Sequence, residues 1–191
     1  MNVRRVVTGN SADGSAVFTS DERLDPVTLE LLPGFEFHSL WGTDSIVELP
    51  SDGSRPMTRG YFPPVPGSRF GFLTIPPDAG DAVPEDLDLT AGLAEFERKL
   101  PGMSEHFEPQ NPGMHTTATV DYGVVLSGKV TLEVDGGAKV ELQSGDTFIQ
   151  NGTRHRWSNA GDHPAVLAIV CVGADQAGRG PTDKTGATLP T

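Results

Sequence analysis

The stretch Gly113-Met-His115-Thr-Thr117-Ala-Thr119-Val-Asp121-Tyr-Gly-Val-Val-Leu-Ser-Gly128 decides the fold of this chain. Side chains along a β-strand alternate between two faces, so residues two positions apart share a face. One face is entirely polar and carries His115, Thr117, Thr119 and Asp121. The opposite face is almost entirely apolar and carries Ala118, Val120, Tyr122, Val124 and Leu126.

This alternation allows two interpretations. In the first, the polar face is solvated, and His115 and Asp121 are surface residues. In the second, the strand belongs to a double-layered barrel whose second sheet, or a partner subunit, covers the apolar face. The polar face then lines a cavity for a small molecule, which is where barrels hold their ligands.

A second stretch, Gly145-Asp-Thr-Phe-Ile-Gln-Asn-Gly152-Thr-Arg-His155-Arg-Trp-Ser-Asn159, favours the barrel. The turn signals Ser144-Gly145-Asp146 and Asn151-Gly152-Thr153 enclose a short predicted strand, and His155 begins the next strand. Two imidazoles and a carboxylate can therefore converge inside a small barrel.

Together the two stretches resemble the paired motifs of the cupin superfamily. The first motif places HxH three or four residues before an acid, and the acid six residues before a glycine; His115, Thr117, Asp121 and Gly128 stand at these positions. In the second motif Gly152, His155 and Asn159 match in spacing, whereas Gln150 replaces a proline and the interval from Gly145 is one residue short. The resemblance implies an all-β fold, a single cupin double-stranded β-helix (jelly-roll) barrel with an N-terminal strand extension and one short helix.

The resemblance also implies a metal site, with a substitution in it. Cupins with a well-formed site offer three His and one Glu, whereas this chain has Thr117 at one His position and Asp121 at the Glu position. The expected ligands are His115, Asp121 and His155, which leave positions open for substrate around Fe, Mn, Zn or Ni. The alternative is a cupin that has lost its metal and keeps the barrel for binding.

Other polar residues are expected around the cavity. Thr117, Thr119, Gln150 and Trp157 are predicted to contact bound water or substrate, or to wall the cavity. His106, just before the first motif, is the candidate catalytic acid or base at the cavity mouth, although a lone loop histidine is more often solvated.

The composition limits the partners. The 191 residues carry a net charge of −12, which argues against binding nucleic acid or an anionic membrane surface. No apolar run is long enough to span a membrane, and the first residues do not resemble a signal peptide. The single cysteine, Cys171, lies in an apolar run that predicts a central strand, and we expect a cytoplasmic protein.

The remaining sequence suggests four segments. Residues 1–85 are predicted as an N-terminal β extension with a Pro-rich loop that packs on the barrel, residues 86–102 as a short helix capped by Thr90, residues 103–173 as the cupin barrel and residues 174–191 as a disordered tail. Cupins of this size use such an extension across the barrel or within a dimer, so we expect a homodimer.

The family resemblance implies a metal-dependent enzyme of the oxidoreductase (dioxygenase) or lyase type. Its substrate is expected to be a small carbonyl compound, organic acid, or aromatic or polyketide-like molecule. The alternative function is a metal-free cupin that binds or senses a small molecule.

Overall fold

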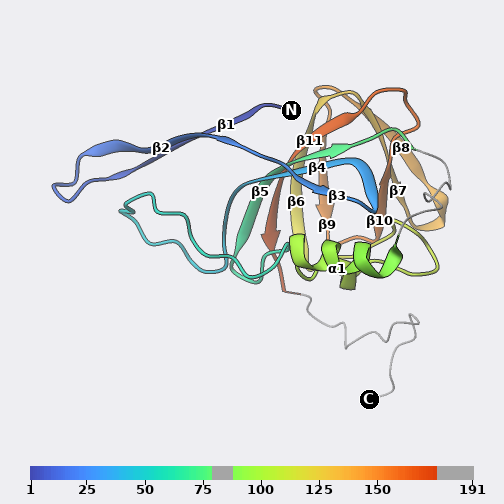
Figure 1. Cartoon of the computed structure of the whole chain (residues 1–191), viewed down its shortest axis with the longest axis horizontal. Helices are drawn as coiled ribbons and strands as arrows, with labels where there is room; N and C mark the ends of the chain where they lie inside the picture. The colour runs from blue at the N-terminus through green and yellow to red at the C-terminus, as the bar shows by residue number, and fades with distance from the viewer. Residues whose placement is uncertain (79–87, 176–191) are drawn as a thin grey trace, which may run out of the picture.

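The computed structural model describes residues 1–78 and 88–175, which form mostly β-structure (Figure 1). In chain order the elements are β1 (Val3–Asn10), β2 (Ala16–Leu24), β3 (Val27–Leu29), β4 (Leu32–Thr43), β5 (Ser68–Ile75), α1 (Leu89–Lys99), η1 (Ser104–His106), β6 (Thr119–Ser127), β7 (Lys129–Val134), η2 (Asp135–Gly137), β8 (Lys139–Gln143), β9 (Thr147–Asn151), β10 (His155–Ser158) and β11 (Ala165–Gly173). The predicted disordered tail lies outside the described residues except for Ala174 and Asp175.

Two antiparallel sheets enclose the main core. One has six strands in the order β3-β4-β5-β11-β6-β9, and the other has three in the order β10-β7-β8. Their inward side chains meet in a cluster of buried residues: Val125, Val130, Phe148, Ala165 and Leu167. The apolar run that contains Cys171 forms β11, which lies between β5 and β6 as the sequence predicts for a central strand.

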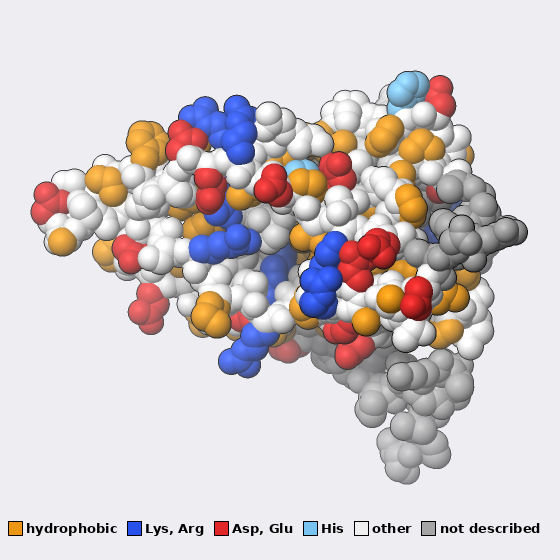
Figure 2. All heavy atoms as spheres, in the orientation of Figure 1, with side chains coloured by type: hydrophobic (Ala, Val, Ile, Leu, Met, Phe, Trp, Pro, Cys, Tyr) orange, Lys and Arg blue, Asp and Glu red, His pale blue; other side chains and the backbone are white. Residues whose placement is uncertain are grey.

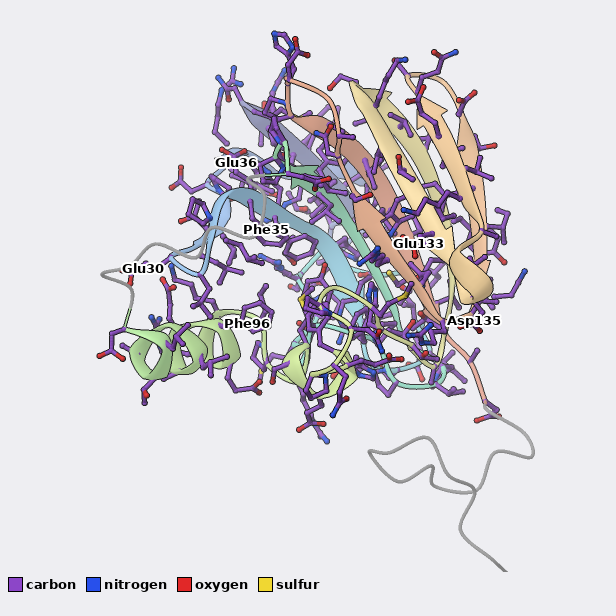
Figure 3. All side chains as sticks on the ribbon, turned by 90° about the vertical axis from the view of Figure 1, so that its right-hand side faces the viewer. Glu30, Phe35, Glu36, Phe96, Glu133 and Asp135 are labelled. Atoms are coloured by element: carbon purple, nitrogen blue, oxygen red, sulfur yellow. The ribbon has the colours of Figure 1, made fainter. Side chains whose placement is uncertain are left out.

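A second core joins the helix to the six-stranded sheet. Phe96 of α1 packs with Phe35 of β4, and Leu29 and Leu100 complete the buried cluster (Figure 3). The prediction that Thr90 caps this helix is wrong: the Asp88 carboxylate accepts hydrogen bonds from the backbone N–H groups of Thr90 and Ala91. Asp88 precedes the first helical turn, where its side chain reaches free N–H groups that the hydroxyl of Thr90, inside the helix, cannot cap.

The N-terminal hairpin extends away from the barrel. Strands β1 and β2 pair only with each other and project beside the segment that follows β4 (Figure 1). That segment reaches the hairpin at Gly9, where a Cβ atom would lie 2.3 Å from the carbonyl carbon of Asp52. The backbone N–H of Asn10 donates a hydrogen bond to the carbonyl of Ser51 at 2.8 Å. The two segments can come this close because Gly9 has no side chain.

The surface is mixed in charge. On the face drawn in Figure 2, Lys and Arg side chains are interspersed with Asp and Glu rather than gathered in one band. On the outer face of the six-stranded sheet, Phe70, Tyr122 and Ile149 remain exposed. Within residues 1–78 and 88–175, no helix is long and apolar enough to cross a membrane.

Candidate functional site

The polar face of β6 points into the barrel. Thr119 is 1% exposed and Asp121 is 7% exposed. The next residue, Tyr122, points to the opposite face and is 50% exposed. The interpretation in which this polar face is solvated is therefore wrong. The regular strand begins only at Thr119, so the prediction that His115 and Thr117 lie on it is also wrong. The chain before Thr119 leaves the ladder because His115 pairs with a different strand.

His115 and His155 are held side by side by their own backbones. The N–H of His115 donates to the carbonyl of His155 at 2.9 Å, and the N–H of His155 donates back at 3.0 Å. This single antiparallel bridge brings the two imidazole rings to a centroid separation of 4.2 Å with 51° between their planes. The structure thus brings together the two predicted imidazole ligands, which are 40 residues apart in sequence.

Hydrogen bonds orient both rings in the same way. The Nδ1 atom of His115 lies 3.0 Å from the carbonyl oxygen of Gly113, and the Nδ1 atom of His155 lies 2.9 Å from that of Thr153. A carbonyl can only accept, so a neutral imidazole carries its proton on Nδ1 and leaves the lone pair on Nε2. Histidines that bind metals in proteins commonly show this arrangement.

Burial keeps both imidazoles neutral. Burial, together with the neighbouring His115, lowers the pKa of His155 to about 4. Burial also lowers the pKa of His115, partly offset by the Gly113 carbonyl and by Asp121. Neutral imidazole is the form that coordinates a metal or accepts a proton.

Asp121 is buried in the barrel, close to Thr119, Cys171 and His115. Burial raises the pKa of this carboxyl group, and Thr119, Cys171 and His115 oppose the increase. Burial and the nearby carboxylate raise the pKa of the Cys171 thiol, which faces Asp121 across the β6–β11 pair. Burial raises the pKa of the Tyr61 phenol, and the nearby Cys171 and Asp121 raise it further.

The residues predicted to surround the site also lie inside. The hydroxyl oxygens of Thr117 and Thr119 are 2.8 Å apart in a hydrogen bond. Gln150 is 4% exposed. The ring of Trp157 lies 6.1 Å from that of His155 and 4.6 Å from that of Phe148, so it packs in the core beside the histidine pair.

His106 lines a cavity of about 800 Å³. Its Nδ1 atom is 2.9 Å from the carbonyl oxygen of Thr116, and its ring packs edge-on against Phe62 at 4.8 Å. The other lining residues are mixed: Asp44, Ser45, Arg59 and Thr119 are polar, and Met57, Phe62 and Pro64 are among the apolar ones. The predicted metal ligands do not line this cavity, and the catalytic role of His106 stays a prediction.

The predicted metal ligands are only partly gathered. Across the part of the chain that the structure describes, no three His, Cys, Asp or Glu side chains lie close enough to hold a metal ion together. His115 and His155 form a pair, and Asp121 does not join them as a third donor. The donor types fit a transition metal, whereas their present spacing supplies a two-histidine site.

Sequence reasoning missed an ion pair that ties the two histidine segments together. The Arg154 guanidinium binds the Glu108 carboxylate through two hydrogen bonds of 2.5 and 2.7 Å, and it binds Asp135 at 2.8 Å. Figure 3 shows Asp135 close to the end of the three-stranded sheet. The Arg154 guanidinium is therefore paired with carboxylates of the protein itself, Glu108 and Asp135. Because the two partners are 46 residues apart, the sequence carried no local signal for the pair.

Comparisons with known proteins agree with this architecture. The family model described as "Cupin domain" matches residues 103–173. Oryzines biosynthesis cluster protein J of Aspergillus oryzae is 50% identical over 25% of this chain and 27% of its own length. Phomopsin biosynthesis cluster protein D of Diaporthe leptostromiformis is 48% identical over 31% of each chain. The cupin-domain-containing oxidoreductase srdD of Neurospora crassa is 37% identical over 24% of each chain.

These alignments span less than a third of the length of each relative, so they describe the shared domain and not a whole protein. The predicted cupin double-stranded β-helix fold, with its mostly β-structure and one α-helix, is confirmed. Residues 103–173 of this chain belong to the cupin domain family.

Proposed function

We propose that this chain is a cupin oxidoreductase that acts on a small, largely apolar organic molecule bound inside the barrel. The observation that carries the proposal is the His115–His155 pair, in which both Nδ1 atoms are bonded to carbonyls, His155 is buried and His115 is half-buried. The name of the Neurospora crassa relative, a cupin-domain-containing oxidoreductase, supports the reaction class. Lyase chemistry on the same substrates remains the second possibility for the reaction.

The proposed cofactor is a divalent transition metal: Fe, Mn, Zn or Ni. His115 and His155 would hold it through Nε2, whereas Asp121, the third ligand expected from the sequence, lies outside this pair in the described structure. Such a metal would supply Lewis acidity and, as Fe, redox chemistry. Two histidine ligands leave several positions open, which suits an enzyme more than a structural metal site.

The residues of the chain have separate tasks in this proposal. Met57 and Phe62 exclude water from the apolar body of the substrate in the cavity. His106 faces the same cavity, with Nδ1 fixed by Thr116, and holds or releases a proton at Nε2. The Glu108–Arg154 ion pair keeps the segment of His115 against that of His155.

A metal-free binding or sensing cupin is the alternative function. Two observations favour it: Thr117 stands where the family usually has a histidine, and Asp121 is not grouped with the histidine pair within the described residues. The two functions differ in whether the chain binds a metal stoichiometrically.

The test is a calorimetric titration of Fe(II), Mn(II), Ni(II) and Zn(II) into tag-free protein after chelator treatment, together with elemental analysis of the protein as purified. We expect one site per chain, and at least a hundredfold weaker binding in His115→Ala and in His155→Ala. His163→Ala is the matched control because the His163 side chain is exposed and bonds only its neighbour Asp162 among the described residues. Equal affinity in all four proteins, or no binding by the wild type, would favour the metal-free function.

A further inference from the structure

Asp121 and Gln150 form a polar pair deep in the barrel. They lie directly opposite each other on the neighbouring antiparallel strands β6 and β9. Residues opposite each other in such a ladder project to the same side with their Cβ atoms about 5 Å apart. Both side chains point inward, since they are 7% and 4% exposed and their neighbours Tyr122 and Ile149 face solvent.

Each of these side chains has one buried polar atom without a partner. Among the described residues, neither Oδ1 of Asp121 nor Nε2 of Gln150 makes a hydrogen bond. The Oε1 atom of Gln150 accepts a hydrogen bond from the Thr153 hydroxyl at 2.7 Å. In this orientation the amide nitrogen is the atom left without a partner among the described residues. Buried polar atoms of native proteins nearly always have a partner, which can be a protein group, a bound water molecule or a ligand.

The two atoms differ in what they can bond. Oδ1 of the carboxylate accepts a hydrogen bond, and Nε2 of the amide donates one. A hydroxyl group satisfies both, because it donates through its hydrogen and accepts through its oxygen. A carbonyl or an ether can only accept, and an ammonium group can only donate.

The pair lies one step beyond the described cavity. Thr119, which lines the cavity of about 800 Å³, is the inward-facing residue immediately before Asp121 on β6. Side chains on one face of a strand repeat about every 7 Å, so Asp121 and Gln150 lie about that distance from the part of the cavity that Thr119 lines. A ligand whose hydroxyl group reached the pair would keep its apolar body against the lining that includes Phe62 and Met57.

We infer that Asp121 and Gln150 bind the hydroxyl group of the substrate, and that the substrate is therefore a small hydroxyl-bearing molecule with an apolar body. This inference rests on the proposed function, of which it names the substrate class. In it Asp121 accepts a hydrogen bond from the substrate rather than serving as the third ligand of a metal.

The test compares two probes of similar shape, 4-methylphenol and 4-methylanisole, which has no hydroxyl hydrogen. Dissociation constants are measured by titration followed in ¹H–¹⁵N NMR spectra. We expect the wild type to bind 4-methylphenol at least tenfold more tightly than 4-methylanisole. Gln150→Met, which keeps the length of the side chain, and Gln150→Glu, which replaces the donor by an acceptor, should reduce this preference to threefold or less.

Gln143→Met is the matched control, because Gln143 is an exposed residue of β8 and should keep the full preference. Two results would overturn the inference: equal affinity of the wild type for the two probes, or an unchanged preference in the Gln150 variant that folds. Near-equal affinities would mean that water or another side chain completes the pair.

Metal titration of Asp121→Asn separates this inference from the proposed function. We expect the variant to retain the metal affinity of the wild type within threefold; its amide oxygen can still accept a hydrogen bond, so metal affinity is the readout of this variant. If the wild type binds no metal but Gln150→Met loses the phenol preference, the proposed function fails and the hydroxyl site stands. If metal binds through the two histidines and Asp121→Asn loses it, Asp121 is a metal ligand and the inference is overturned.

Discussion

The buried imidazole of His155 should make the stability of the chain depend on pH in a predictable direction. The side chain is 3% exposed, and its pKa falls from 6.5 to about 4 in the folded protein. Between these values the unfolded chain binds the proton and the folded chain does not. The stabilisation by the neutral ring is therefore complete above pH 6.5 and is lost as the pH falls toward 4.

The size of this effect follows from the two pKa values. One pKa unit corresponds to about 1.4 kcal/mol. Because the pKa of His155 is about 4 in the folded protein, the unfolding free energy should fall by about 2 kcal/mol between pH 7 and pH 4.5. His115 adds to the loss in the same direction, because its pKa is lowered as well.

The assay is urea unfolding of chelator-treated protein at pH 7 and pH 4.5. His155→Gln cannot titrate, so its loss of stability over this range should be about 2 kcal/mol smaller than that of the wild type. His163→Gln removes an exposed imidazole and should retain the loss seen in the wild type. If His155→Gln shows the full loss of the wild type, the His155 ring is not held neutral by burial and the reasoning fails.

Four further predictions concern the Glu108–Arg154 ion pair, the core between the sheets, the cap of α1 and the expected homodimer. Glu108→Gln should lower the unfolding free energy by only about 0.5–1 kcal/mol, because the ion pair with Arg154 is partly exposed, yet the backbone amides of His115 and His155 should exchange faster by hydrogen-exchange NMR. Leu167→Ala, which empties a position with 0% exposure between the two sheets, should cost about 2–5 kcal/mol in urea unfolding. Asp88→Ala should cost about 1 kcal/mol in the same assay, since the cap of α1 is lost, whereas Thr90→Ala should cost less. We expect light scattering to give the mass of a homodimer, and the double change Tyr122→Lys with Ile149→Lys, on the exposed outer face, to give a monomer; a wild-type monomer would contradict the expectation.

The fold was largely predictable because its determinants are local. Alternation of polar and apolar residues from Thr119 to Leu126 divided β6 into two faces, and the second stretch, whose glycine turns bounded β9 and β10, favoured the polar face as the inward one. The confirmed family domain also covers the segment predicted as the barrel, residues 103–173. The helix was found by its apolar spacing, whereas its cap was misplaced because Asp88 and Thr90 are both good capping residues and only geometry separates them.

The site was less predictable because its arrangement depends on distant contacts. The His115–His155 bridge takes His115 out of the strand that its sequence pattern suggested. Tyr61 comes from the Pro-rich segment before β5, and its approach to Asp121 has no signature in sequence. Motif spacing correctly placed two imidazoles together, but it could not say whether the Asp121 carboxylate on β6 reaches them.

The central claim is that His115 and His155 form a metal-binding pair inside the barrel, and anomalous diffraction tests it most directly. Crystals grown with cobalt(II) chloride and measured at the cobalt absorption edge would locate the ion independently of any assay of activity. We expect one strong peak within about 2.2 Å of the Nε2 atoms of both histidines. A peak only at the exposed His163, or none in the barrel, would contradict it.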